Sequence, residues 1–202
     1  MIKQILFDCG GVLTELNFRQ LMEEISGSKE VAQCLIESLW GPGAPWLEYD
    51  KGNINTEQIG PAMREHMPAQ YHPYLEVFLQ RWLEALPQME GMEEIVDDLH
   101  AAGYPCYLLS NFSEGFQLMP ERTPVLRKLD GMVISYEIHM LKPDPEVYRY
   151  TARTLGFELG ETLFIDDNAH NIESAIETGL AGYQFTTPAA LREFLRRQNI
   201  LP

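Results

Sequence analysis

Short apolar runs alternate with helical segments in the second half of the chain, and this alternation constrains the fold more than any other feature. Four apolar runs have the length of a buried strand, at residues 104–110, 131–135, 162–167 and 181–185. Helical patterns lie before the first run and between later ones, at residues 91–103, 143–156 and 171–179, and an amphipathic helix follows near the C-terminus. Strands that alternate with helices predict βαβ units and a parallel sheet.

The first half of the chain contains one more strand and then changes its rhythm. Residues 2–7 form a short apolar run that ends at Asp8 and opens into a loop with two glycines. From about residue 16 to residue 88 every periodic segment is helical, and no strand interrupts them. We therefore expect an α/β fold, a Rossmann-like parallel sheet sandwiched by helices with a helical cap inserted after the first strand. The expected division is a core of residues 1–15 and 89–202 and a cap of residues 16–88.

Composition narrows the class of protein. The 202 residues are 45% hydrophobic and 22% charged, which is typical of globular proteins, and no apolar run approaches the length of a membrane span. A formal net charge of -15 argues against nucleic acid as a partner. Three widely spaced cysteines indicate neither disulfides nor zinc, and the first apolar stretch is too short for a signal peptide, so we expect a cytoplasmic protein. The sequence leaves open whether it is a monomer or a dimer.

Polar side chains gather where the predicted strands end. In an open parallel sheet these ends form one crevice, which is where ligands bind. The residues at or just after strand ends are Asp8, Ser110, Asn111, Lys142, Asp166 and Asp167. Three carboxylates at short range need a compensating cation, and oxygen ligands without a histidine or cysteine cluster favour magnesium over zinc or copper. Lys142 would hold a nucleophilic carboxylate and a substrate phosphate in register, with Ser110 and backbone amides binding the phosphate oxygens.

Four segments, in this order, carry a family resemblance. They are FDCGGVL at 7–13, LLSN at 108–111, KPDPEVY at 142–148 and FIDDNAHNIESAIETG at 164–179. Together they resemble the four motifs of the haloacid dehalogenase superfamily, with a cap-sized insertion after the first. Within that superfamily the chain is similar to the capped sugar-phosphate phosphatases, and in particular to the α-D-glucose-1-phosphate phosphatase branch.

The resemblance implies a magnesium-dependent phosphatase acting on a small phosphorylated metabolite. Asp8 would attack phosphorus and form an aspartyl phosphate, which water then hydrolyses. Mg²⁺ would be held by Asp8, the Gly10 carbonyl and Asp167, with Asp166 acting through a bound water. Ser110 and Asn111 would bind the phosphate, and Lys142 would neutralise charge in the transition state.

Gly10 departs from the pattern, because most phosphatases of this superfamily carry an acid–base aspartate two residues after the nucleophile. Loss of a general acid typically costs about a hundredfold to ten-thousandfold in rate, so the enzyme is either slow or suited to a good leaving group. A sugar 1-phosphate, with its anomeric oxygen, meets the second condition.

Two alternatives stay open. Haloacid dehalogenases also lack that aspartate and attack carbon without a metal. Their fourth motif, however, is a serine-containing loop, where this chain has Asp166 and Asp167. A non-catalytic phosphometabolite-binding regulatory protein is the other alternative, and an intact Asp8 argues against it.

The predicted cap contains aromatic and acidic residues that have two interpretations. They either line a substrate pocket or fill the interior of the helical insertion, as aromatic residues commonly do. These residues are Trp40, Trp46, Glu48, Tyr49 and Asp50.

Overall fold

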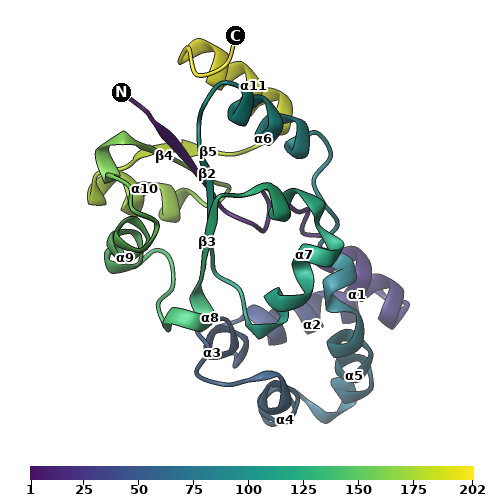
Figure 1. Ribbon diagram of the computed structural model, residues 1–202. Coiled ribbons are helices and arrows are strands. Elements are labelled where there is room, and N and C mark those ends of the chain that lie inside the picture. The colour runs from purple at the N-terminus through teal and green to yellow at the C-terminus, as the bar shows by residue number, and fades with distance from the viewer.

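A five-stranded parallel sheet forms the centre of the molecule (Figure 1), in a computed structural model that describes residues Met1–Pro202. The strand order is β3-β2-β1-β4-β5, and every neighbouring pair is parallel. The strands are β1 (Gln4–Phe7), β2 (Cys106–Ser110), β3 (Gly131–Ile134), β4 (Thr162–Asp166) and β5 (Ala181–Gln184). The predicted α/β class with a parallel sheet is therefore confirmed.

Helices cover both faces of this sheet, because successive side chains of a strand point to opposite sides. Ile5 and Phe7 join one buried cluster with side chains of α6 (Met92–Ala101) and α11 (Pro188–Arg197). Leu6 joins a second cluster with side chains of α9 (Pro145–Leu155) and α10 (Ala169–Thr178). The result is a sandwich of three layers in which β1, buried on both faces, is the central strand.

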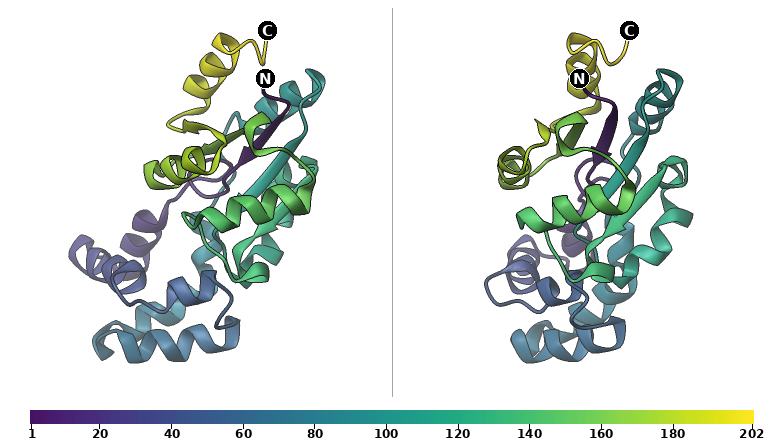
Figure 2. Two further views of the ribbon diagram at one scale, coloured as in Figure 1. Left: turned by 90° about the vertical axis from the view of Figure 1, so that its left-hand side faces the viewer. Right: turned by 60° about the vertical axis from the view of Figure 1, so that its left-hand side comes forward.

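The chain between β1 and α6 contains helices joined by loops, and no strand. It forms a hydrophobic cluster of its own with 13 buried residues, separate from the two clusters on the sheet. Figures 1 and 2 show these helices beyond the end of the sheet that lies opposite the two chain termini. The helices are α1 (Phe18–Ser26), α2 (Lys29–Trp40), α3 (Trp46–Asp50), α4 (Thr56–His66), η1 (Ala69–Tyr71), α5 (His72–Arg81) and η2 (Trp82–Ala85).

Two connections join this helical region to the sheet, and they run side by side. The Glu15 N–H donates to the Pro87 carbonyl at 2.9 Å, and the Asn17 N–H donates to the Ala85 carbonyl at 2.8 Å. Further along the chain, the Ser135 hydroxyl donates to the Asp50 carbonyl at 2.5 Å. The Glu114 carboxylate also accepts from the N–H and hydroxyl of Thr56 at the start of α4. The helical region therefore contacts the sheet layer at both its ends and again at Asp50 and Thr56, in its middle.

Several short helices were not predicted from the sequence. They have three to five residues each, fewer than two turns, so they show no hydrophobic period. Ser135, expected to end the third strand, instead begins α8 (Ser135–Ile138). The others are α3 and the turns η3 (Glu114–Leu118), α7 (Met119–Arg122), η4 (Pro124–Lys128) and η5 (Leu159–Glu161). None of the helices has the length and apolar character needed to cross a bilayer.

Candidate active site

Asp8 follows the central strand, so the ends of β2 and β4 lie on either side of it. Its N–H donates to the Ile165 carbonyl at 2.9 Å, which extends the pairing with β4 by one residue and brings Asp8 level with Asp166. Asp8 is 8% exposed and Asp166 is fully buried. The sheet thus brings two carboxylates from distant segments together at one end.

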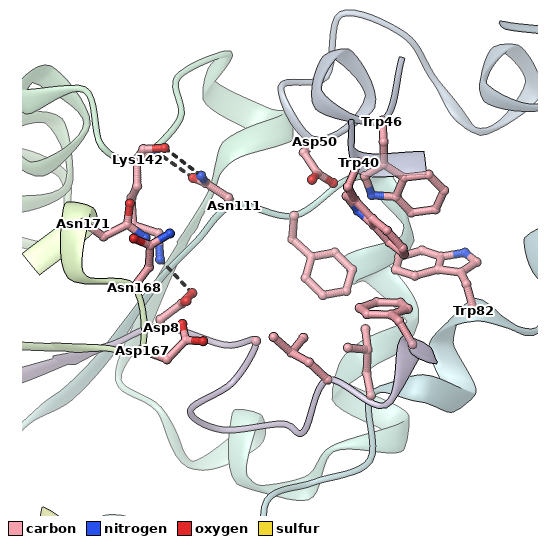
Figure 3. Close-up of a pocket in the computed structure, with 15 residues that line it drawn as sticks. Asp8, Trp40, Trp46, Asp50, Trp82, Asn111, Lys142, Asp167, Asn168 and Asn171 are labelled. Atoms are coloured by element: carbon pink, nitrogen blue, oxygen red, sulfur yellow. Dashed lines mark hydrogen bonds and ion pairs between the residues drawn. The ribbon is translucent and has the colours of Figure 1, made fainter. Parts of the chain in front are cut away.

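Lys142 joins these two carboxylates. Its ammonium lies 2.7 Å from Asp8 Oδ1 and 2.7 Å from Asp166 Oδ2, and its side chain is 1% exposed. Asn111 fixes the backbone at this point, because its amide donates to the Lys142 carbonyl at 2.9 Å and accepts from the Lys142 N–H at 2.8 Å. Figure 3 shows the pair of bonds. Asn111 therefore positions the lysine, and both polar groups of its side chain are already engaged.

Burial and charge shift the ionisation of this cluster. Burial raises the pKa of Asp8 to about 7; the Asp166 carboxylate adds to the shift, and Lys142 opposes it. Burial by itself would lower the pKa of Lys142, but the two adjacent carboxylates outweigh it and the pKa is raised. The lysine is therefore a fixed positive charge, and a second cation near Asp8 would favour the ionised carboxylate that a nucleophile requires.

The two acids of the fourth motif have different surroundings. Asp166 accepts hydrogen bonds on both oxygens, from the Asn168 N–H at 2.8 Å, from the Asn171 amide at 3.1 and 3.0 Å, and from Lys142. The Asp167 carboxylate is partly exposed and pairs with no basic side chain. Its pKa is raised, first by burial and then by the charge of Asp166. Asp167 is therefore the acid of this pair that is available to a ligand.

The arrangement fits a divalent cation with oxygen ligands. Carboxylate oxygens of Asp8, Asp166 and Asp167 lie within 4.8 Å of one another, close to the span of about 4.2 Å between opposite ligands that are each about 2.1 Å from one ion. The Gly10 carbonyl beside them accepts no hydrogen bond. Because the oxygens of Asp166 are already occupied, the groups free to ligate are Asp8, Asp167 and the Gly10 carbonyl.

A cavity of about 390 Å³ opens from this cluster toward the helical region. Figure 3 shows its two ends: Asp8, Lys142 and Asp167 stand on one side, and tryptophan rings on the other. Such a volume suits a small metabolite. The lining residues are Asp8, Gly10, Leu16, Phe18, Trp40, Trp46, Asp50, Trp82, Leu86, Asn111, Phe112, Lys142, Asp167, Asn168 and Asn171.

Of the predicted site residues, only Asp166 and Ser110 are absent from the cavity wall. Asp166 lies behind Lys142 and contacts it directly. Ser110 ends β2 and is 1% exposed, so its predicted contact with phosphate stays a prediction.

The aromatic and acidic residues of the helical region divide between the two interpretations. Trp40, Trp46 and Asp50 line the cavity, whereas Tyr49 is buried among the helices and Glu48 is exposed. Other residues that line the cavity were not predicted from the sequence. Asn171 could have been predicted, because it lies four residues after Asp167 and one helical turn places it near the end of the strand. Trp82 and Phe112 could not have been predicted, because only the fold brings them to the cavity.

Comparison with known proteins agrees with this geometry. The chain is 24% identical to the D-ribitol-5-phosphate phosphatase of Bacteroides thetaiotaomicron over 96% of this chain and 97% of that protein. It is 30% identical to the (S)-2-haloacid dehalogenase 4A of Burkholderia cepacia, over 88% and 80%. It spans only 60% of flavin mononucleotide hydrolase 1 of Arabidopsis thaliana, at 26% identity over 74% of this chain.

A solved structure is also similar. A magnesium complex of a haloacid dehalogenase family enzyme from Bacteroides thetaiotaomicron superimposes with a TM-score of 0.76, at 26% identity, and the match covers 96% of this chain and 98% of that one. The sequence model of one protein family, the haloacid dehalogenase-like hydrolases, matches residues 2–179 of this chain. With the four motifs converging at Asp8, these matches establish that the chain belongs to the haloacid dehalogenase-like hydrolase family.

Proposed function

We propose that this protein is a magnesium-dependent phosphatase that hydrolyses a small phosphorylated metabolite through an aspartyl phosphate on Asp8. One observation carries the proposal. The Asp167 carboxylate, which pairs with no basic group, stands beside a carboxylate that Lys142 already holds, and Gly10, whose carbonyl accepts no hydrogen bond, lines the same cavity. A magnesium ion held by Asp8, Asp167 and the Gly10 carbonyl would offset the negative charge of the substrate phosphate and of the attacking carboxylate.

The side chains of this protein supply the remaining chemistry. A carboxylate oxygen of Asp8 attacks phosphorus, the bond between phosphorus and the ester oxygen breaks, and the leaving alkoxide takes a proton from water. A second water then attacks the acyl phosphate, which releases inorganic phosphate and restores the carboxylate. Lys142 neutralises charge on the phosphoryl oxygens, and Asn111 and Asp166 hold the lysine in place.

Gly10 limits the leaving groups that such a site can handle. It offers no side chain to protonate the leaving oxygen, and Asp8, the nucleophile, is the one acid of this loop on the cavity wall. We propose that the natural substrate has an activated leaving oxygen, for which a sugar 1-phosphate is the candidate that the sequence suggests. Turnover of hexose 1-phosphates should then exceed turnover of hexose 6-phosphates, and equal rates would refute the preference.

Residues 16–88 would act as a cap over this site. The paired connections at its base and the separate hydrophobic cluster within it support this division. Closing such a cap excludes bulk water from the phosphoryl group. Ser110 would bind a phosphate oxygen when the cap closes.

A metal-independent dehalogenase is a second candidate, supported by the absence of a side chain at Gly10 and by the 30% identity to a dehalogenase. Asp167 argues against it, since an acid close to Asp8 and without a cation would raise the pKa of the nucleophile. The two candidates differ in their need for metal and in the product released.

One experiment separates them. Phosphate release from a panel of phosphomonoesters is measured with Mg²⁺ and with a chelator, for the wild type, Asp8→Asn and the exposed control Asp97→Asn. We expect release that needs Mg²⁺, falls by at least about a thousandfold in Asp8→Asn, and persists in the control. Chloride release from a 2-chloroacid that is unaffected by the chelator would favour the dehalogenase. Ligand binding with no turnover of any compound would favour a regulatory protein.

Cytoplasmic residence belongs to the same proposal. All three cysteines are free, and Cys9 and Cys106 are buried, which suits a reducing compartment. Whether the protein acts as a monomer or a dimer stays open.

A further inference from the structure

The end of the cavity away from Asp8 is walled by aromatic rings. Five side chains form a continuous series in which each ring contacts the next, with centroid separations of 4.7, 5.7, 5.3 and 5.5 Å. In order, they are Phe18, Trp40, Trp46, Trp82 and Phe112. Four come from the helical region and Phe112 follows β2, so the wall exists only when the two regions are together. We call this set the aromatic wall; Figure 3 shows its three tryptophans side by side.

Asp50 stands next to the aromatic wall and is the one charged lining residue outside the cluster around Asp8. Figure 3 shows its carboxyl group directed into the cavity. Its backbone is held in place, because the Asp50 carbonyl accepts from the Ser135 hydroxyl. No basic side chain pairs with the carboxyl; burial raises its pKa to about 8, and the backbone of Ser113 opposes the shift. The one basic residue that lines the cavity, Lys142, already pairs with Asp8 and Asp166.

A carboxyl group that has no basic partner and lies beside aromatic rings favours a positively charged ligand. Aromatic rings attract cations through their negative faces, and quaternary ammonium groups are bound in this way by sets of aromatic side chains. A cation bound beside Asp50 would itself favour the ionised form of this carboxyl group, and the carboxylate then adds a direct electrostatic attraction. A neutral polyol would need many hydrogen-bond partners, whereas this end of the cavity offers one carboxyl group and the indole N–H groups of three tryptophans.

We propose that the substrate is a phosphomonoester whose leaving group carries a positively charged nitrogen, seated against the aromatic wall and paired with Asp50. The proposal rests on the phosphatase function above and specifies the organic half of its substrate; it replaces the sugar 1-phosphate that the sequence suggests with an ester activated by a charged nitrogen. It also fits Gly10, because a cationic nitrogen near the ester oxygen withdraws electrons and makes that oxygen a better leaving group. In such a substrate the phosphate and the nitrogen bind at opposite ends of the cavity.

The decisive comparison uses two esters of nearly equal shape. Phosphocholine carries a trimethylammonium group, and 3,3-dimethylbutyl phosphate has a neutral tert-butyl group in its place. We expect kcat/KM to favour phosphocholine by at least about tenfold in the wild type, from cation–π attraction and the carboxylate together. In Asp50→Asn this ratio should fall by about tenfold or more. In the control Glu48→Gln, an exposed acid of the same helix, it should not change. The intrinsic difference between the two leaving groups cancels when the ratios are compared.

A ratio that is the same in the wild type and in Asp50→Asn would overturn the proposal, as would turnover of hexose 1-phosphates at least about tenfold above that of phosphocholine. If the protein were not a phosphatase at all, the result would be distinguishable, because no ester would then release phosphate.

Binding measured without turnover, and without any variant, provides a second test. Choline chloride should change the tryptophan fluorescence of the wild type with saturation, and 3,3-dimethylbutanol at equal concentration should bind at least about tenfold more weakly. Equal binding of the two compounds would refute the inference even if Asp50→Asn failed to fold.

Discussion

Replacing Gly11 by alanine tests whether the loop after Asp8 is built around Asp167. Gly11 has a φ of +75°, and a Cβ added there would lie 2.4 Å from Asp167 Oδ2 and 2.7 Å from its Cγ. Ordinary contact begins at about 3.4 Å, so the carboxylate must retreat by about 1 Å or the loop must move by as much. The positive φ adds about 1–2 kcal/mol of backbone strain.

These two costs can be measured separately, because Gly27→Ala is a matched control. Gly27 has a φ of +67°, and its Cβ would meet nothing within 4 Å. Gly27→Ala should lower the free energy of unfolding by about 1–2 kcal/mol and leave phosphate release unchanged. Gly11→Ala should show at least that loss of stability and, in addition, a fall in kcat/KM of about a hundredfold, since a displacement of about 1 Å in a positioned group costs that much.

The assays are urea unfolding in Mg²⁺-free buffer, phosphate release, and the Mg²⁺ concentration that gives half-maximal rate. We expect the half-maximal Mg²⁺ concentration to rise in Gly11→Ala and to stay constant in Gly27→Ala. If Gly11→Ala kept the wild-type rate and the wild-type Mg²⁺ requirement, Asp167 would not be a ligand held by this loop.

Three further predictions concern the buried charges and the contact between the helical region and the sheet. Lys142→Met leaves Asp8 and Asp166 buried without a cation, so urea unfolding without Mg²⁺ should show a loss of about 3–5 kcal/mol, and phosphate release should vanish; unchanged stability would contradict the pairing. Because the pKa of Asp50 is about 8 in the folded protein against an ordinary 3.8, the folded state binds more protons between these values and stability falls as pH rises. The melting temperature should therefore drop less between pH 5 and pH 8.5 in Asp50→Asn than in the wild type, and parallel curves would refute the shift. A Cβ at Gly52 would lie 2.2 Å from the Tyr136 carbonyl, so Gly52→Ala should melt several degrees below Gly43→Ala, which has nearly the same φ but open space around it; equal melting temperatures would mean that this contact does not hold the two regions together.

Much of the fold could be predicted because its signals are local. A buried strand of a parallel sheet is a short apolar run, and its end is marked by the first polar residues after it. Asp8 and Asp166 were therefore recognisable as strand ends from their neighbours alone. The short helical turns after β2 could not be recognised, because a single turn carries no hydrophobic period and depends on the surfaces around it.

Part of the site could likewise be predicted from the sequence, and part could not. The order of the four motifs indicated which side chains meet, because parallel strands deliver their ends to one edge of the sheet. It could not show which polar groups stay free. Asn111 was expected to bind phosphate, which stays a prediction; the structure adds that its amide is hydrogen-bonded to the Lys142 backbone. Asp166 was expected to act through water, which also stays a prediction; its oxygens accept hydrogen bonds from Lys142 and Asn171.

The sequence by itself determined the class of fold, the nucleophile candidate and the acidic residues around it, because each depends on a run of adjacent residues. Only the tertiary structure decided the character of the far end of the cavity. Trp46 and Trp82 are 36 positions apart in the chain, yet their rings pack at 5.3 Å, and Phe112 joins them from the sheet. Asp50 acquires its raised pKa from the same packing, which removes water from its carboxyl group. Desolvation and ring contact arise between segments, so no local pattern of residues encodes them.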